Sequence, residues 1–311
     1  MVVKNNAEFG IELALSVPYA YWLHKQDQLE TVITSKGMKP FYYFCDDVRE
    51  EYNHRTIDNK AAGLDELPNN WIHGDNGKGV LDYSKWICPP YKEYFSNNEF
   101  LFKNKTVFII NKYNWEHDHI PYGYFDIQCL YNIFNILTSK GYTVIYKRCD
   151  NKSPSITFDQ NEQKSLISGY TDIRANVEGI GTITDKELTQ YYDDVILFDD
   201  LLKTSNYSYN ETQLKVMANC THYISVCGGN GILSSLFGGN TILYIHTGKE
   251  LRPGYFGKDS YFQKLSDNKL TPIFDVIHNI KDNYTPEPYE HKVNTTGKND
   301  YSELLETIKL L

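Results

Sequence analysis

A glycine-rich turn late in the chain carries the strongest indication of chemistry. The sequence Gly-Gly-Asn-Gly joins a strand predicted at 222–226 to a helix predicted at 232–237. The residues of this glycine turn are Gly228, Gly229, Asn230 and Gly231. Glycine permits positive φ and close approach of the backbone, and N–H groups that open a helix favour an anion. We predict a phosphate site here; the alternative is a tight strand-to-helix turn with no ligand.

Two cations lie near the ends of predicted strands. Lys112 follows the apolar run 107–110, and Arg148 follows the run 143–146. Ligands of parallel α/β folds bind outside the carboxyl ends of the strands. We therefore expect Lys112, with Arg148 as a second candidate, to neutralise a bound diphosphate. For each of them, a solvated surface charge is the alternative.

Alternating strand and helix patterns predict the parallel α/β fold that would position these residues. The first unit has a helix at 11–26, in which Pro18 is expected to kink the helix or mark its first turn. Further strands are predicted at 29–34 and 40–45, and a second unit starts at 107–110. An amphipathic helix is expected at 300–311.

Composition and charge exclude some classes of function. The chain has 311 residues, 31 Lys and Arg and 40 Asp and Glu, so its formal net charge is −9. This length suits two domains or one large one. An acidic chain without a dense run of cations repels a phosphate backbone, so nucleic acid is not expected as a partner. A local phosphate site built from backbone N–H groups remains compatible with this charge.

The apolar runs and the cysteines set further limits. No apolar run approaches the roughly 20 residues that cross a bilayer. Because the first residues also lack the apolar core of a secretory signal, we expect a cytoplasmic protein with no membrane span. The six cysteines include no C-x-x-C pair, so reduced thiols are expected and a structural zinc site is not.

The segment 218–244 reads Ala-Asn-Cys-Thr-His-Tyr-Ile-Ser-Val, followed by the glycine turn and then by Leu-Phe-Gly-Gly-Asn-Thr. It resembles the donor-binding half of GT-B-type glycosyltransferases, in layout closest to bacterial heptosyltransferases and fucosyltransferase-like enzymes. Residues 9–18 resemble the heptosyltransferase start, where a glycine turn and an acid precede a helix with a proline. The family's late turn usually contains Asp-Ser-Gly; Cys-Gly-Gly-Asn-Gly replaces it here, which leaves the nucleotide and the sugar open.

The resemblance implies an α/β fold with two Rossmann-like domains that face each other across a cleft. Residues 1–103 would form the acceptor-side domain and 104–275 the donor-binding domain, and 276–311 would end in a helix that packs back on the first domain. The implied activity is sugar transfer from a nucleotide-diphosphate-sugar, UDP- or GDP-linked, to a glycan or other hydroxyl acceptor. Neither a metal nor another cofactor is expected.

The resemblance also implies roles for four acidic or aromatic residues. It places the catalytic base in the first loop, where Glu12, six positions before Pro18, is preferred to Glu8. The alternative for Glu12 is an acid at the helix N-terminus that only interacts favourably with the helix macrodipole. Glu250 would accept hydrogen bonds from the ribose and Tyr255 would stack on the base, with a polar surface loop as the alternative.

Other interpretations stay open. The pair Asp199-Asp200 follows an apolar strand, where a GT-A-type glycosyltransferase binds a divalent cation. His117 and His119 lack a third metal ligand, so substrate contact or exposure is expected for them. The aromatic content of 14% also suits a non-catalytic carbohydrate- or nucleotide-binding module. An NAD-linked oxidoreductase is the third class, although the spacing of the turn differs from the G-x-G-x-x-G fingerprint.

Overall fold

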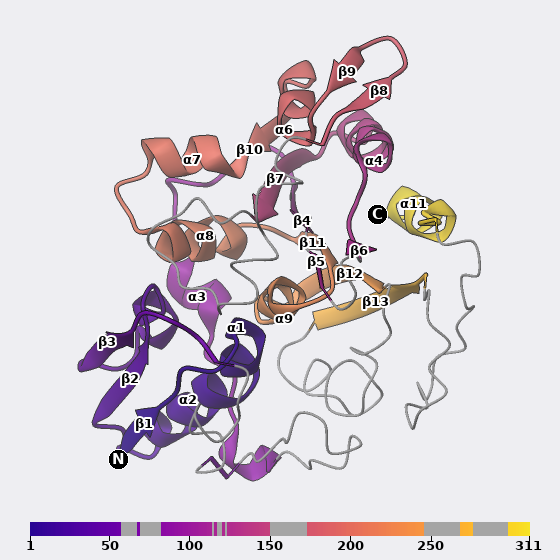
Figure 1. Cartoon of the computed structure of the whole chain (residues 1–311). Coiled ribbons are helices and arrows are strands. Elements are labelled where there is room, and N and C mark those ends of the chain that lie inside the picture. Colours follow the sequence, from indigo (N-terminus) through magenta and orange to yellow (C-terminus); the bar gives the residue numbers. More distant parts are fainter. Residues whose placement is uncertain are drawn as a thin grey trace.

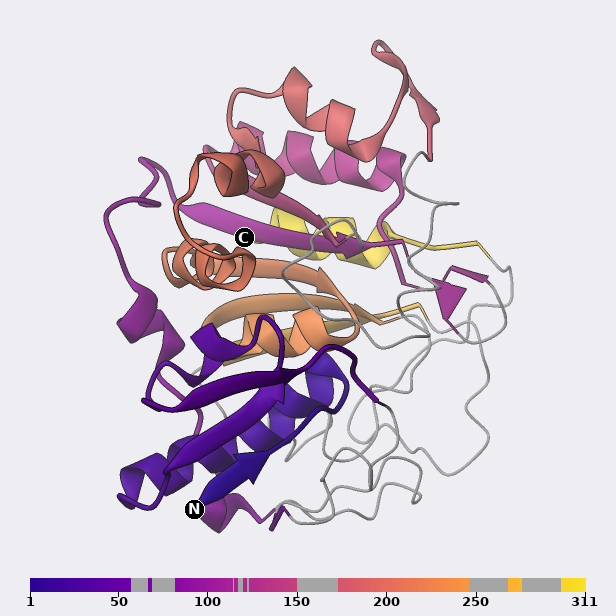
Figure 2. The same ribbon diagram turned by 60° about the vertical axis from the view of Figure 1, so that its left-hand side comes forward.

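Two α/β units, each built on a parallel sheet, make up the described part of the chain (Figures 1 and 2). This confirms the two-unit α/β fold expected from the sequence. The computed structural model describes residues 1–56, 67–68, 82–113, 115–116, 120–121, 123–149, 173–245, 268–275 and 298–311.

The first unit is a three-stranded sheet in the order β1-β2-β3, with both pairs parallel. Its strands are β1 (Val2–Lys4), β2 (Thr31–Ser35) and β3 (Val48–Tyr52). The aromatic segment predicted as a strand at 40–45 instead contains a 3₁₀ turn, Lys39–Tyr42, with Phe41 and Tyr42 buried. The 40–45 prediction was therefore wrong, and the third strand comes from the polar sequence that follows.

A single helical run connects β1 to β2 and passes through a π-helical turn. It comprises α1 (Phe9–Ile11), the π turn Glu12–Ser16 and α2 (Val17–Lys25). Pro18 lies in the first turn of α2, as one of the two expectations had it. Because proline has no N–H, it cannot bond to the carbonyl of Ala14 four residues earlier. The indole Nε1 of Trp86 donates to that oxygen instead, at 2.8 Å.

The second unit is a six-stranded parallel sheet in the order β10-β7-β4-β11-β12-β13. In chain order this is 3-2-1-4-5-6, the doubly wound order, which reverses between β4 and β11. The strands are β4 (Thr106–Lys112), β7 (Thr143–Cys149), β10 (Val195–Leu197), β11 (His222–Val226), β12 (Gly239–Ile245) and β13 (Asn268–Phe274).

Helices cover both faces of this sheet (Figure 1). One face carries α4 (Ile127–Ser139), α6 (Asp185–Leu188) and α11 (Ser302–Lys309). The other face carries α7 (Phe198–Thr204), α8 (Tyr209–Ala218) and α9 (Gly229–Ser235). Two short hairpins complete the unit: β5 (Trp115–Glu116) with β6 (Ile120–Pro121), and β8 (Ala175–Val177) with β9 (Gly181–Ile183).

The first unit packs directly on the α8–α9 face of the second. Leu13 and Leu15 belong to the same apolar core cluster as Leu233 and Phe237 of the second unit. The short helix α3 (Tyr91–Phe95) lies against α8 (Figure 1). Because one core is continuous across both units, the helical run that starts at Phe9 is fixed relative to the six-stranded sheet.

The C-terminal helix packs on the second unit, so the prediction that it returns to the first domain was wrong. The apolar side chains of Leu304 and Ile308 are fully buried in the core cluster that contains α4. The hydroxyl of Tyr301 donates to the carbonyl of Tyr124 at 2.8 Å. The apolar stripe of α11 therefore packs against α4 of the second unit. No helix among the described residues is both long and apolar enough to span a bilayer.

Candidate functional site

The sequence-predicted cation and the glycine turn meet where the strand order of the large sheet reverses. Lys112 ends β4, and the glycine turn follows the adjacent strand β11. Gly228 has φ +107° and ψ −167°, a conformation available essentially only to glycine. A Cβ atom added to Gly228 would lie 3.1 Å from Nζ of Lys112. The ammonium group of Lys112 therefore lies directly beside the turn.

The next glycine of the turn serves the contact between the two units. A Cβ atom on Gly229 would lie 2.8 Å from Cδ1 of Phe9 and 3.0 Å from the backbone N of Gly10. A Cβ on Gly10 would in turn lie 3.0 Å from Cα of Gly229. Close approach of α1 to α9 thus explains Gly229 without a ligand. Gly231 is buried, and its N–H donates to the carbonyl of Gly228 at 2.9 Å.

The side chain of Asn230 forms hydrogen bonds with two side chains of strand β7. Its Oδ1 accepts from Nζ of Lys147 at 3.2 Å, and its Nδ2 donates to Sγ of Cys149 at 3.1 Å. Lys147 and Cys149 are two residues apart and therefore share one face of the strand. Since β4 lies between β11 and β7, Asn230 reaches across the end of β4. The turn is therefore attached to the strands on either side of Lys112.

Lys147 is a functional candidate that the sequence analysis did not identify. The residue is 3% exposed, and its Nζ also donates to Oε1 of Gln213. Burial lowers the pKa of Lys147, while the nearby Cys149 and Asp199 oppose that shift. Strand alternation could have identified Lys147, because it lies on the same face of β7 as Ile145. Ile145 packs in the apolar core cluster that also contains the first unit, so Lys147 faces that unit's side of the sheet.

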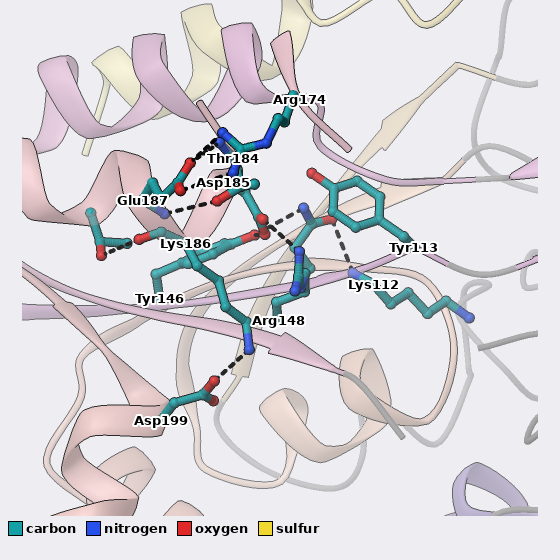
Figure 3. Close-up of polar contacts among 12 residues, drawn as sticks. Lys112, Tyr113, Tyr146, Arg148, Arg174, Thr184, Asp185, Lys186, Glu187 and Asp199 are labelled. Carbon is teal, nitrogen blue, oxygen red and sulfur yellow. Dashed lines mark hydrogen bonds and ion pairs between the residues drawn. The ribbon is translucent and has the colours of Figure 1, made fainter. Parts of the chain in front are cut away.

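Arg148 lies on the opposite face of β7 from Lys147. Its hydrogen bond goes to Asp185 rather than to the glycine turn, and Figure 3 shows this contact. Its Nη1 lies 2.6 Å from Oδ1 of Asp185, and both side chains are buried. The hydroxyl of Tyr146 donates to the other oxygen of Asp185 at 2.5 Å, and Nδ2 of Asn111 donates to that hydroxyl at 3.2 Å. Burial raises the pKa of Asp185 against the opposing effect of Arg148. Figure 3 shows the side chain of Lys112 extending away from this network.

Glu12, the preferred base, is completely buried with both carboxylate oxygens engaged. Nη1 of Arg55 lies 2.6 Å from Oε2 of Glu12. Oε1 accepts from the hydroxyl of Tyr42 at 3.0 Å and from Oγ1 of Thr34. Burial and the neighbouring Glu12 raise the pKa of Tyr42. In this arrangement Glu12 is not presented to an acceptor hydroxyl.

Glu8, the second candidate base, precedes the helix that touches the glycine turn. It is the residue before α1, directly followed by Phe9 and Gly10, and it is half-buried. Its carbonyl accepts from the N–H of Glu12 at 2.9 Å. Nη1 of Arg55, the partner of Glu12, also donates to the carbonyl of Ala7 at 2.6 Å. The buried ion pair therefore anchors the backbone next to Glu8.

The remaining candidates lie elsewhere or outside the described residues. His117, His119, Glu250 and Tyr255 lie outside the residues that the structure describes. Asp199 bonds to Lys186, and Asp200 lies 2.7 Å from Lys203. Within the described residues, no three or more His, Cys, Asp or Glu side chains form a group that could hold a metal ion.

Comparisons with known proteins give two structural likenesses. No protein-family model matches the sequence, and no curated protein sequence matches it. The structure of E. coli ADP-heptose LPS heptosyltransferase II is 8% identical, with a TM-score of 0.48 and 91% of each chain covered. E. coli heptosyltransferase WaaC, solved with ADP-2-deoxy-2-fluoro heptose, is 12% identical, with a TM-score of 0.32 and 81% of this chain and 64% of that chain covered. Both of these proteins are heptosyltransferases.

Proposed function

We propose that this protein is a glycosyltransferase that moves a sugar from a nucleoside-diphosphate-sugar to a hydroxyl group of a glycan or similar acceptor. The observation that carries the proposal is the ammonium group of Lys112 beside Gly228, at the reversal point of a sheet in doubly wound order. Ligands of such sheets bind outside the carboxyl ends of the strands at this point. The sequence resemblance supplies the sugar-transfer part of the proposal.

The position of the glycine turn favours this function over a dinucleotide-dependent oxidoreductase. In dinucleotide-binding folds the glycine-rich loop follows the first strand of the sheet. Here it follows β11, the fourth strand of the sheet in chain order. The first strand, β4, is followed instead by the polar sequence Tyr-Asn-Trp-Glu-His-Asp-His.

Sugar transfer needs a cation for the leaving group and a base for the acceptor. When the bond from the anomeric carbon to the diphosphate oxygen breaks, negative charge builds on the diphosphate, and Lys112 stabilises it. Glu8 removes the proton of the acceptor hydroxyl, because it belongs to the segment that meets the turn. Glu12 acts through Arg55 as a positioning residue for that segment.

We propose metal-independent transfer, with Lys112 supplying the positive charge. The acidic pair of the metal-dependent alternative is engaged by lysines, Asp199 by Lys186 and Asp200 by Lys203. Transfer should therefore persist in a chelator. Transfer that vanishes in chelator and returns with Mn²⁺ would establish the metal-dependent alternative.

Nucleotide binding provides the first test. Titration calorimetry of the folded protein with ADP, GDP and UDP should show binding of at least one of them. Lys112→Met should weaken that binding at least tenfold, because it removes the charge beside Gly228. Lys203→Met, an exposed lysine on α7, is the matched control and should bind like the wild type. If the folded wild type binds none of the three, the proposed function fails.

A non-catalytic nucleotide-binding module is the second candidate function. The observation that favours it is the ion pair of Glu12, since the residue in the expected position of the base is held by Arg55. A Glu8→Gln variant that keeps nucleotide affinity and loses transfer supports the enzyme. Nucleotide binding without transfer across a panel of donors and acceptors supports the module.

A further inference from the structure

The hydrogen-bond partners of Lys147 differ in kind from those of the buried arginines Arg55 and Arg148. Arg55 and Arg148 each pair with a carboxylate at 2.6 Å. Within the described residues, the oxygens that accept from Nζ of Lys147 are the side-chain amide oxygens of Gln213 and Asn230. A buried ammonium group without a bonded carboxylate is costly. Such uncompensated groups concentrate at functional sites.

The groups around Lys147 leave its charge largely uncompensated. The thiol of Cys149 lies on the same face of β7 as Lys147. Asp199 of α7 also acts on the charge of Lys147, but its carboxylate already pairs with Lys186 of α6. The ring of Tyr209 on α8 lies 5.2 Å from Nζ. Lys112 on β4 is paired in register with Cys149 and adds a second positive charge. An anion at the glycine turn would meet both cations.

We propose that Lys147 is a positioning residue of the donor site, which fixes Asn230 in the glycine turn and provides a buried positive charge, so that binding of a diphosphate is coupled to protonation of Lys147. This inference rests on the proposed function. The other three residues of the turn are glycines, so Asn230 alone has a polar side chain there, and Lys147 donates a hydrogen bond to it.

Proton uptake follows from the burial of Lys147. Burial lowers the pKa of its ammonium group in the free protein. A bound diphosphate favours the charged form, so the pKa of Lys147 rises in the complex. At pH values between those two pKa values, binding must take up protons. A lysine with a purely structural role would not produce this signature.

The experiment measures affinity and proton uptake together. ADP, GDP, UDP and inorganic pyrophosphate are titrated into the folded protein between pH 7 and pH 9, in pairs of buffers with different ionisation enthalpies. Lys147→Met should lose at least tenfold in affinity and should take up fewer protons than the wild type with the same ligand, since protons gained or lost by the phosphates themselves are common to both proteins. Lys92→Met is the matched control, because Lys92 is a surface lysine whose pKa is also lowered by partial burial of its ammonium group, and it donates to the carbonyl of Cys220, which precedes β11 at the amino end of the strands.

Each outcome decides the inference. Wild-type affinity and wild-type proton uptake in Lys147→Met overturn it while leaving the proposed function intact. Equal losses in Lys92→Met also overturn it, since the effect would then be general. If neither nucleotide nor pyrophosphate binds the folded wild type, the proposed function and this inference both fail. Should circular dichroism show that Lys147→Met is unfolded, Asn230→Ala is used: it removes the acceptor at 3.2 Å, and unchanged affinity in it overturns the inference.

Discussion

Strand β7 carries two consecutive cations that meet opposite environments. Arg148 faces α6, where a buried carboxylate and a tyrosine hydroxyl complete a closed network. Lys147 faces α8 and α9, where two amide oxygens accept its hydrogen bonds. The alternation of side chains along a strand separates the two residues onto opposite faces of one sheet.

The contrast separates a cation that supports the fold from one that is available to a ligand. The charge of Arg148 is neutralised within the chain, so an anion would have to displace Asp185 to use it. The charge of Lys147 is buried beside the glycine turn, with the carboxylate of Asp199 already shared with Lys186. Removing the first cation should therefore cost stability, and removing the second should cost ligand affinity.

The largest expected effect is the loss of stability in Arg148→Met. This change leaves Asp185 buried without its counter-ion, and breaking a buried pair in this way costs about 3–5 kcal/mol. Urea denaturation at pH 7 measures the free energy of unfolding. Arg174→Met is the control, because the Arg174–Glu187 pair is exposed and such pairs contribute only about 0–1 kcal/mol. Equal losses in the two variants would show that Arg148 has no special role on its face.

The second effect tests the glycine that joins the first unit to the site. In Gly229→Ala the new methyl group meets Cδ1 of Phe9 at 2.8 Å and the backbone N of Gly10 at 3.0 Å. Because backbone cannot move aside easily, we expect a loss of about 2–3 kcal/mol in the free energy of unfolding.

The control for this overpacking is Gly179→Ala. Gly179 has φ +80° and no atom within 4 Å of an added Cβ, so only backbone strain of about 1–2 kcal/mol is expected there. A Gly229→Ala variant that is no less stable than Gly179→Ala would mean that α1 and α9 are not held in close contact.

Most elements of the second unit could be predicted because their patterns are local. The runs at 107–110, 143–146 and 222–226 are rich in β-branched and aromatic residues, and they form parts of β4, β7 and β11. Strand β13 was missed because Pro272 interrupts it, which a strand tolerates at the sheet edge where β13 lies. Strand β3 was missed because its Val-Arg-Glu-Glu-Tyr sequence is polar, as an edge strand permits.

The site could be predicted only where position along a strand decides the outcome. The rule that ligands lie at the carboxyl ends of strands was enough to pair Lys112 with the glycine turn. Arg148 was predicted as a ligand-binding cation and Lys147 was overlooked. To choose correctly between them, one must know that Arg148 pairs with Asp185, which lies 37 residues away in the chain. The engagement of Glu12 likewise depends on Arg55, a contact that no local pattern indicates.

The smallest effect, and the one that separates the two faces most cleanly, is the pH dependence of stability in Lys147→Met. The pKa of Lys147 is lowered in the folded protein, while an unfolded lysine titrates near 10.4. The folded state therefore binds this proton less tightly than the unfolded state does. The stability that comes from the neutral amine is present above the unfolded pKa and is lost as the pH falls through the folded pKa.

At pH 7 the wild type thus carries the cost of a buried charge that Lys147→Met lacks. We expect the variant to lie within about 1 kcal/mol of the wild type or above it, since replacing a buried charge by an apolar side chain is often neutral or stabilising. The stability of the wild type should then rise relative to the variant between pH 7 and pH 10 in urea titrations. Taking the difference between the two proteins cancels titrations common to both. A loss above 3 kcal/mol at pH 7 in Lys147→Met would show that Lys147 stabilises the fold as Arg148 does, and the distinction between the two faces would be wrong.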